Sequence, residues 1–338
     1  MTDVGTENLL EVSGLRVQFA ASGGKALRAV DGVSFHVKRG ETLGIVGESG
    51  CGKSVACMSI LKLVPGAKYA GGRALFDGHD TLQMNEKRLR ALRGARVAMI
   101  FQEPMAALNP VHTIGQQICE AIRLHLPLSG AEARALATET LRQVRVPDAE
   151  RVFNSYPFSL SGGLRQRAMI AMALVCKPDL LIADEPTTAL DVTIQSQIMA
   201  LIRRLREQTG MAVILISHDL GLISESADDI LVMYAGRVCE YAPADELVNN
   251  PLHPYTLGLI QSRPSGIGVG AGMSADASAG GRLRTIPGNV PSIEERPAGC
   301  PFHPRCERAS ERCAAEVPPE TAPVAGHTVS CWLYAEEM

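Results

Sequence analysis

The stretch GESGCGKS at residues 47–54 decides the fold that this sequence predicts. It has the form G-x-x-x-x-G-K-[ST], whose glycines let backbone N–H groups turn inward around phosphate oxygens. The aliphatic run 42–46 before it is typical of a buried strand, and Val55, Met58 and Leu61 after it favour an apolar helix. We therefore predict a strand, a phosphate-binding loop and a helix of an α/β core, in preference to a plain glycine-rich turn.

A loop of this form holds the phosphates of a nucleotide. The N-terminal end of the following helix adds a partial positive charge to the loop. Lys53 is expected to reach the β- and γ-phosphates, and the Ser54 hydroxyl is expected to ligate Mg²⁺. The loop residues predicted to contact the nucleotide are Gly47, Ser49, Gly50, Cys51, Gly52, Lys53 and Ser54.

Three further aliphatic runs are followed at once by polar side chains: 97–101 by Gln102, 180–183 by Asp184 and Glu185, and 213–216 by Ser217 and His218. The carboxyl ends of strands are where open α/β sheets bind ligands. Adjacent carboxylates repel each other, and a Mg²⁺ ion held by Asp184, directly or through water, would offset that charge. Glu185 would then polarise the water that attacks the γ-phosphate. An exposed acidic turn is the alternative.

Helical patterns fill the intervals between these runs. Apolar residues spaced along one face predict a helix that ends at Thr209-Gly210: Ile194, Ile198, Leu201, Ile202 and Leu205. Ser129 with Glu132 has the form of a capping box that opens a second helix, in a strand-poor interval from about 105 to 165. We expect that interval to be a helical insertion. Residues 264–282 are small, and we expect them to form a flexible linker.

The stretch LSGGLRQR at residues 160–167 resembles the LSGGQ-type signature of ABC ATPases. Taken alone, it is also compatible with a helix start that Ser161 caps. Together with the motifs above, the resemblance covers roughly residues 8 to 262. It implies an α/β fold, a RecA-like P-loop NTPase core with an antiparallel β subdomain and a helical subdomain at about 105–165, in an ATPase domain of residues 1–262. In this family Ser161, Gly162 and Gly163 contact the γ-phosphate of ATP bound on the opposite subunit, so a dimer is implied.

The remaining motifs follow the order of the same family. Gln102 stands as the Q-loop residue with a contact to Mg²⁺, and His218 stands as the switch histidine that hydrogen-bonds to the γ-phosphate. Residues 188–191 stand as the D-loop, which ends in Asp191. Phe19 is placed like the aromatic residue that stacks on adenine, although a lone Phe is usually a core residue. The resemblance thus implies an ATPase that uses ATP and Mg²⁺, with Glu185, His218 and Gln102 as its catalytic residues.

Four passages look like the peptide/nickel-importer branch of that family: FQEPMAALNP (101–110), LIADEPTTALDVTIQ (181–195), ISHDLGLISESAD (216–228) and NPLHPYTLGLI (250–260). Phe158-Ser159 stand where the branch usually has His-Gln, and Leu164 stands where Met is common. The branch implies import of dipeptides or oligopeptides through two permease subunits, with an extracytoplasmic peptide-binding protein and a second, related ATPase subunit. A heterodimer of ATPases is therefore favoured over a homodimer. Nickel or another small solute is the alternative cargo.

Four of the nine cysteines lie near the C-terminus: Cys300, Cys306, Cys313 and Cys331. Four thiolates suit a tetrahedral Zn²⁺ ion or an iron–sulfur cluster, and the C-x2-C pairs of a zinc ribbon are missing. The text CPFHPRC resembles the C-terminal extension of peptide-importer ATPases, which in some members holds a [4Fe–4S] cluster. That resemblance favours the cluster over zinc and over free thiols or disulfides, with residues 263–338 as linker and extension. His303 and His327 are spare candidate ligands that we expect at the surface.

Composition limits the class of partner and the location. The formal net charge of −3 disfavours a general nucleic-acid binder. No apolar run reaches the roughly 18 residues of a membrane-spanning helix, and the N-terminal MTDVGTENLLEV lacks the layout of a signal peptide. We therefore expect a protein held by its partners at the cytoplasmic face of the inner membrane. A soluble ABC machine would commonly have two cassettes or a long coiled coil, and a non-hydrolysing regulatory subunit would not need Glu185.

Overall fold

The computed structural model describes residues 8–20, 26–188, 190–262 and 285–335, apart from the side chain of Pro104. The predicted linker 264–282 lies outside the described residues. The chain divides into two compact units. The first unit is Met1–Leu9, Val37–Glu41 and Gln83–Leu215, and the second unit is Leu10–His36, Thr42–Leu82 and Ile216–Met338.

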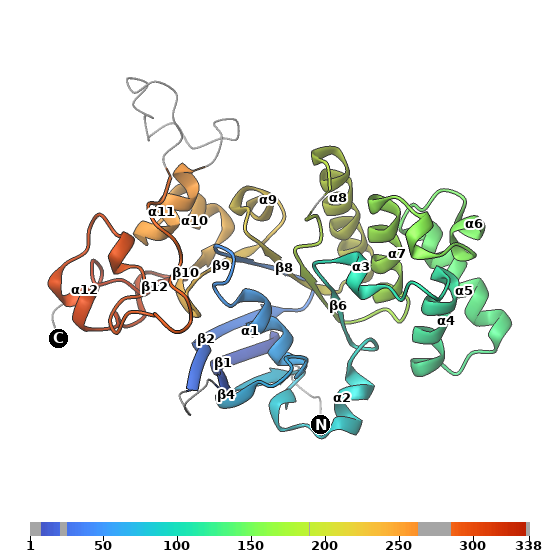
Figure 1. The fold of residues 1–338 in the computed structure, drawn as a ribbon, viewed down its shortest axis with the longest axis horizontal. Coiled ribbons are helices and arrows are strands. Elements are labelled where there is room, and N and C mark those ends of the chain that lie inside the picture. The colour runs from blue at the N-terminus through green and yellow to red at the C-terminus, as the bar shows by residue number, and fades with distance from the viewer. Residues whose placement is uncertain (1–7, 21–25, 189, 263–284, 336–338) are drawn as a thin grey trace. The chain divides into compact units, whose positions relative to one another are not determined.

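The first unit combines three strands with a group of helices. Its strands lie in the order β8, β7, β6, and β6 and β7 are parallel. The elements that lie wholly or mainly in this unit are β6 (Val97–Ile100), β7 (Leu180–Asp184), β8 (Ala212–Ser217), α2 (Glu86–Leu92), α3 (Pro104–Ala107), α4 (Ile114–His125), α5 (Gly130–Gln143), α6 (Ala149–Phe153), the 3-10 helix η2 (Pro157–Ser159), α7 (Gly162–Leu174) and α8 (Val192–Thr209). Helices α4, α5, α6 and α7 pack together in Figure 1. The predicted run 97–101 is one residue too long, because β6 ends at Ile100 and Phe101 is 41% exposed.

Local sequence signals set the helices of this unit. The capping box predicted at Ser129 is confirmed, because its side chain accepts from the Glu132 N–H and Glu132 accepts from the Ser129 N–H. Thr113 and Gln116 form a second capping box at the start of α4. Helix α8 ends, as predicted, at Thr209, where Gly210 adopts the left-handed conformation that closes a helix.

The second unit contains two sheets. One sheet has the order β2-β1-β4-β5, and the second unit contributes β11-β12-β10-β9-β3 to the other. The elements that lie wholly or mainly in this unit are β1 (Asn8–Ala20), β2 (Ala26–Lys38), β3 (Thr42–Val46), α1 (Lys53–Ile60), β4 (Lys68–Phe76), β5 (His79–Asp80), η1 (Thr81–Gln83), α9 (Leu220–Ser224), β9 (Asp229–Tyr234), β10 (Arg237–Pro243), α10 (Ala244–Asn249), α11 (Pro254–Gln261), η3 (His303–Arg305), α12 (Glu311–Ala315), β11 (Thr321–Val324) and β12 (His327–Val329).

Strand β3 and helix α1 flank the predicted phosphate loop. All residues of β3 are buried, and β3 is parallel to β9, with Val46 opposite Val232. Helix α1 begins at Lys53, as the motif predicts. Its buried face, however, is not the face that the large apolar residues Val55 and Met58 indicated. Ala56, Cys57 and Ile60 are buried there, whereas Val55 and Met58 are only half-buried. Small side chains pack this helix closely, and they carry little hydrophobic signal in a sequence.

The C-terminal residues continue the sheet of the second unit. Strand β12 is antiparallel to β10 and to β11, so a hairpin from the last part of the chain extends the β9–β10 pair. Figure 1 shows this segment, in orange to red, beside β10. The expectation that His327 lies at the surface is wrong. The hairpin buries its side chain completely, and its Nε2 lies 2.7 Å from Glu240 Oε1.

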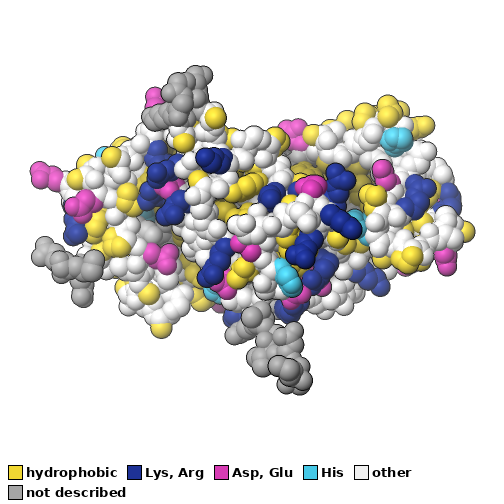
Figure 2. Space-filling view, turned by 90° about the horizontal axis from the view of Figure 1, so that it is seen from below, with side chains coloured by type: hydrophobic (Ala, Val, Ile, Leu, Met, Phe, Trp, Pro, Cys, Tyr) yellow, Lys and Arg dark blue, Asp and Glu magenta, His cyan; other side chains and the backbone are white. Residues whose placement is uncertain are grey.

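One face of the surface carries side chains of both charges (Figure 2). In Figure 2 the Lys and Arg side chains of one face lie in several groups, with Asp and Glu among them. Across the described ranges, no helix combines the length and the apolar character that crossing a bilayer demands.

Candidate functional site

The glycines of loop 47–54 are required by its backbone. Gly47 has φ 156°, and a Cβ there would lie 2.2 Å from the Met233 carbonyl oxygen. Gly52 has φ 98°, and its Cβ would lie 2.8 Å from the Ala29 oxygen. Any larger residue would collide with backbone at both positions, so the loop can pass this close to its neighbours only with glycine.

Lys53 closes the loop on itself. Its side chain is 5% exposed, and Nζ donates to Gly47 O at 2.7 Å and to Glu48 O at 3.1 Å. Nζ also lies 3.7 Å from the buried Cys51 Sγ. Burial raises the pKa of that thiol, although the lysine charge lowers it in part. The ammonium group is therefore held inside the loop, where the phosphates of a nucleotide would be bound.

Two residues that the sequence analysis did not assign hold Glu48 of this loop. The Glu48 N–H donates to the Tyr255 hydroxyl at 2.8 Å. The Arg305 guanidinium donates to both Glu48 carboxylate oxygens, with NH1–Oε2 at 2.6 Å and NH2–Oε1 at 3.0 Å. Burial strongly raises the pKa of Tyr255, which keeps its hydroxyl protonated. Tyr255 and Arg305 occur in PLHPYT and CPFHPRC, two passages that look like the peptide-importer branch. That resemblance is the only feature of the sequence that could have pointed to these two residues.

The acidic end of β7 lies in the first unit, together with Gln102. Asp184 is buried, and Glu185 has φ 45°, a left-handed conformation that strains a residue with a side chain. Glu185 Oε2 accepts from Gln102 Nε2 at 3.0 Å and from the Thr188 hydroxyl at 2.8 Å. The structure thus brings together two predicted catalytic residues, Gln102 and Glu185, and adds Thr188.

The signature stretch places Ser161 at the N-cap of α7. Unlike Ser129 on α5, it makes no side-chain capping hydrogen bond. Gly162 has room, because an added Cβ would first meet Leu190 Cδ2 at 3.4 Å. The alternative of a helix start capped by Ser161 therefore lacks its hydrogen bond.

The other predicted residues divide between the two units. Asp191 belongs to the first unit and caps α8 by accepting from the Ile194 N–H at 2.9 Å. Phe19 lies half-buried near the end of β1, and exposed His218 follows β8 directly; both belong to the second unit. Mg²⁺ prefers oxygen ligands, and the side chains of Ser54, Gln102 and Asp184 each contain an oxygen atom of a suitable kind.

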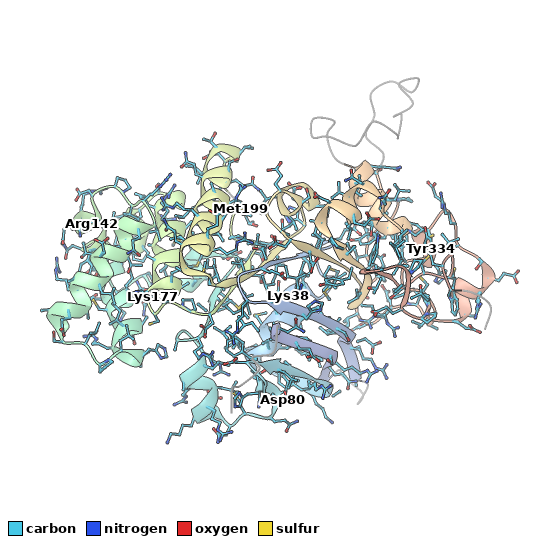
Figure 3. The ribbon with its side chains drawn as sticks, turned by 180° about the vertical axis from the view of Figure 1, so that it is seen from behind. Lys38, Asp80, Arg142, Lys177, Met199 and Tyr334 are labelled. Atoms are coloured by element: carbon cyan, nitrogen blue, oxygen red, sulfur yellow. The ribbon has the colours of Figure 1, made fainter. Side chains whose placement is uncertain are left out.

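The four C-terminal cysteines line one cavity of about 90 Å³, together with His303 and Trp332. Burial, with a smaller contribution from the other three thiols, raises the pKa of Cys300 to about 11. Tyr334, labelled among the crowded side chains of Figure 3, donates its N–H to Cys331 O at 3.1 Å. No disulfide joins any of the nine cysteines, all of which are described.

These four thiols do not form a ligand sphere around a single ion. In the described parts of the chain, no three or more His, Cys, Asp or Glu side chains are grouped so that they could hold one metal ion. The arrangement therefore does not fit a tetrahedral Zn²⁺ site. The four thiols share one cavity, and the described residues offer no grouping that supports either Zn²⁺ or an iron–sulfur cluster.

Comparisons with known proteins identify the family. Residues 30–188 match the family model described as ABC transporter, and residues 239–313 match the model for the oligopeptide/dipeptide transporter C-terminal region. A Sinorhizobium fredii protein named as a peptide ABC transporter ATP-binding protein is 50% identical over 96% of this chain and 94% of its own. The chain belongs to the ABC transporter ATP-binding proteins, in their oligopeptide/dipeptide branch.

Two further relatives and two solved structures agree with this membership. The oligopeptide transport ATP-binding protein OppD of Salmonella typhimurium is 45% identical over 98% of this chain and 95% of its own. The dipeptide transport ATP-binding protein DppD of Bacillus subtilis is 45% identical over 97% and 95%. The ATP-binding cassette MJ0796, solved as a dimer with ADP and Pi, has a TM-score of 0.63 at 28% identity, covering 70% of this chain and 98% of that one. A Clostridium perfringens cassette, cbiO1, has a TM-score of 0.61 at 28% identity, covering 72% and 91%.

This ABC transporter subunit is an ATPase by family. The solved cassettes match its α/β P-loop fold over about two thirds of its length.

Proposed function

We propose that this subunit hydrolyses ATP to power the import of dipeptides or oligopeptides. The observation that carries the proposal is the presence, in one chain, of the ABC transporter match at 30–188 and the oligopeptide/dipeptide transporter match at 239–313. The relatives at 45–50% identity are named for peptide, oligopeptide or dipeptide transport and are matched over nearly their whole length.

In the proposed reaction each motif has a separate task. Gly47, Ser49, Gly50, Cys51 and Gly52 direct backbone groups toward the phosphates, and Phe19 stacks on adenine. Lys53 leaves the Gly47 and Glu48 carbonyl oxygens to bind the β- and γ-phosphates. Ser54, Gln102 and Asp184 hold Mg²⁺, which supplies charge neutralisation at the phosphate oxygens.

Glu185 acts on the attacking water, and His218 donates a hydrogen bond to the γ-phosphate. The Glu185 carboxylate accepts the water's hydrogen bond and orients it for attack in line with the leaving group. The hydrogen bonds from Gln102 and Thr188 support this role, because they fix the direction of the carboxylate. The strained φ of Glu185 supports it too, since strain is often kept at functional positions.

ATP is proposed to be shared between two ATPase subunits. Ser161, Gly162 and Gly163 of one subunit would contact the γ-phosphate held by the other, with Asp191 in the adjoining D-loop. Support comes from the N-cap position of Ser161, where the N–H groups of the first turn of α7 and the serine O–H can donate to a phosphate. Closure of such a dimer by ATP favours one state of the permease over the other, and hydrolysis returns it.

The proposed complex contains two permease subunits, an extracytoplasmic peptide-binding protein and a second ATPase subunit, with a heterodimer favoured. It places this subunit at the cytoplasmic face of the inner membrane, as a peripheral protein without a nucleic-acid partner. We further propose an ATPase domain at 1–262 with its helical part at about 105–165, followed by a linker and the four-cysteine extension at 263–338.

We also propose that Cys300, Cys306, Cys313 and Cys331 hold a [4Fe–4S] cluster in preference to Zn²⁺. Support comes from the one cavity that all four thiols line and from the resemblance of CPFHPRC to cluster-holding extensions. The positive irons would lower the raised thiol pKa values, because they stabilise thiolates. The proposed role is structural or sensory, since these residues lie outside the nucleotide motifs.

The deciding experiment reconstitutes the complex of this subunit with its permease, its ATPase partner and its binding protein in vesicles. Short peptides should stimulate ATP hydrolysis and accumulate inside, and a Lys53→Ala variant should do neither. Accumulation of nickel instead of peptide would replace the proposed cargo. Equal ATP hydrolysis with and without the permease and binding protein would contradict the transport proposal.

A further inference from the structure

Arg305 is a buried arginine outside the predicted nucleotide motifs, and it joins the four-cysteine region to the phosphate loop. Its side chain is 5% exposed, and it makes the two-pronged ion pair with Glu48 described above. Two parallel N–H···O bonds of this kind fix the carboxylate in direction as well as in distance. Burial opposes the charge, yet hydrogen bonds from Arg305 to Glu48 and Tyr234 raise the arginine pKa, so the guanidinium stays charged.

The guanidinium is itself held by backbone. Arg305 donates to Pro287 O at 2.7 Å, to Gly288 O at 3.2 Å and to Ile286 O at 3.4 Å. It also donates to the Tyr234 hydroxyl at 3.3 Å. Because the side chain has this many fixed partners, it is held in one position. A movement of the segment that carries Arg305 would therefore also move Glu48.

Glu48 links Arg305 to the part of the loop that is proposed to bind the nucleotide. Its backbone oxygen accepts from Lys53 Nζ at 3.1 Å and from the Cys51 N–H at 3.3 Å, and its N–H donates to Tyr255. A shift of Glu48 would therefore change the position of the lysine side chain that we assign to the β- and γ-phosphates. Arg305 acts on Lys53 through a single intervening residue.

The segment that carries Arg305 also carries two of the four thiols. Backbone hydrogen bonds tie His303 N to Cys300 O, Arg305 N to Phe302 O and Cys306 N to His303 O. The Phe302 ring packs against Tyr234 and Tyr255, with ring centroids 5.3 Å apart in both pairs. The turn from residue 300 to 306 thus connects two of the thiols, through backbone hydrogen bonds, to the guanidinium that holds Glu48.

We propose that Arg305 is a positioning residue of the nucleotide site, which holds Glu48 and the phosphate loop in place and lets the four-cysteine region set how tightly the chain holds ATP. This inference rests on the proposed function, because it requires that loop 47–54 bind ATP. Arg305 touches no reacting atom. Its effect falls on ATP affinity, and the step of hydrolysis at saturating ATP is affected less.

The test is a double-mutant cycle on ATP affinity, measured by titration calorimetry with the purified full-length chain. The variants are Arg305→Gln, Glu48→Gln and the double variant, with Arg305→Lys as the conservative change. Each single glutamine variant should weaken ATP binding on the order of tenfold, and the double variant should be no weaker than the singles. Arg305→Lys should fall between wild type and Arg305→Gln, since it keeps the charge and loses the two-pronged geometry.

Arg142→Gln is the matched control. It removes an exposed arginine of helix α5, outside the four-cysteine extension, that pairs with Glu139 at 3.3 Å. It should leave ATP affinity unchanged. A merely structural ion pair would lower the thermal midpoint of the free chain without this pattern of coupled affinities.

Two results would overturn the inference. One is unchanged ATP affinity in Arg305→Gln, and the other is a double variant whose loss equals the product of the single losses. If Arg305→Gln does not fold, the cycle of Arg305→Lys with Glu48→Gln gives the same answer. Failure of the wild-type chain to bind ATP would instead contradict the proposed function, so the two failures are distinguishable.

Discussion

Gln102 Nε2 donates a hydrogen bond to Glu185 Oε2 at 3.0 Å, joining the second residue after β6 to the first residue after β7. The Thr188 hydroxyl donates to the same oxygen at 2.8 Å. Two donors on one carboxylate oxygen hold the side chain in a single orientation. The ends of two neighbouring parallel strands thus hold one carboxylate in a fixed position, which is what the proposed role of Glu185 requires.

Replacing this carboxylate separates binding from hydrolysis. Glu185→Gln in the reconstituted complex should lower ATP turnover by about 100-fold or more, because the amide is a much weaker acceptor for the water's proton. ATP binding should remain. The control is Glu207→Gln, the same chemical change on exposed helix α8, and it should leave turnover unchanged. Turnover near the wild-type rate in Glu185→Gln would remove Glu185 from the mechanism.

Two serine N-caps allow a matched comparison of folding and function. Ser129→Ala should lower the free energy of unfolding by about 1 kcal/mol, because its hydroxyl caps α5. Ser161→Ala should leave stability nearly unchanged, since the hydroxyl caps nothing on α7. Chemical denaturation of the two purified variants measures both effects.

The same pair should behave in the opposite way in hydrolysis. Ser161→Ala combined with Gly162→Ala should lower ATP turnover of the assembled complex by about 10- to 100-fold, because donors to the γ-phosphate are lost or displaced. ATP binding by the isolated chain should not change, since the signature is assigned to the other subunit's nucleotide. Ser129→Ala with Gly130→Ala should keep full turnover. Normal hydrolysis with every Ser161 and Gly162 replaced would dismiss the shared pocket.

What the sequence could predict depended on how local the physical signal was. The buried strand Thr42–Val46 and the capping box at Ser129 are written in adjacent residues, and both are confirmed. The Arg305 and Tyr255 contacts with Glu48 span 257 and 207 positions, and neither is visible as a pattern or spacing. His327 was misplaced for the same reason, because its burial depends on pairing between β12 and β10.

The four-cysteine proposal has a spectroscopic test. Purified protein reconstituted anaerobically with iron and sulfide should develop visible absorbance and bind about four irons per chain. Cys306→Ser should lose most of that absorbance, whereas Cys119→Ser, on helix α4 and not among the residues that line the cavity, should keep it. Binding of one zinc without iron would favour the alternative metal, and equal absorbance in Cys306→Ser would reject these four ligands.

Buried His253 should make stability depend on pH. Burial lowers its pKa to about 4, and its Nδ1 accepts from the Tyr255 N–H at 3.0 Å, so the ring is neutral in the folded chain. The unfolded chain takes up this proton near pH 6.5. The contribution of this group to the free energy of unfolding is therefore fully present above about pH 6.5 and is lost as the pH falls toward about 4. At pH 5 the free energy of unfolding should be lower by about 2 kcal/mol. His253→Asn keeps an acceptor and cannot be protonated, so its urea-unfolding curves should shift less between pH 7 and pH 5. His79→Asn, on exposed β5, should retain the wild-type shift, and equal shifts in all three proteins would show that His253 does not titrate this way.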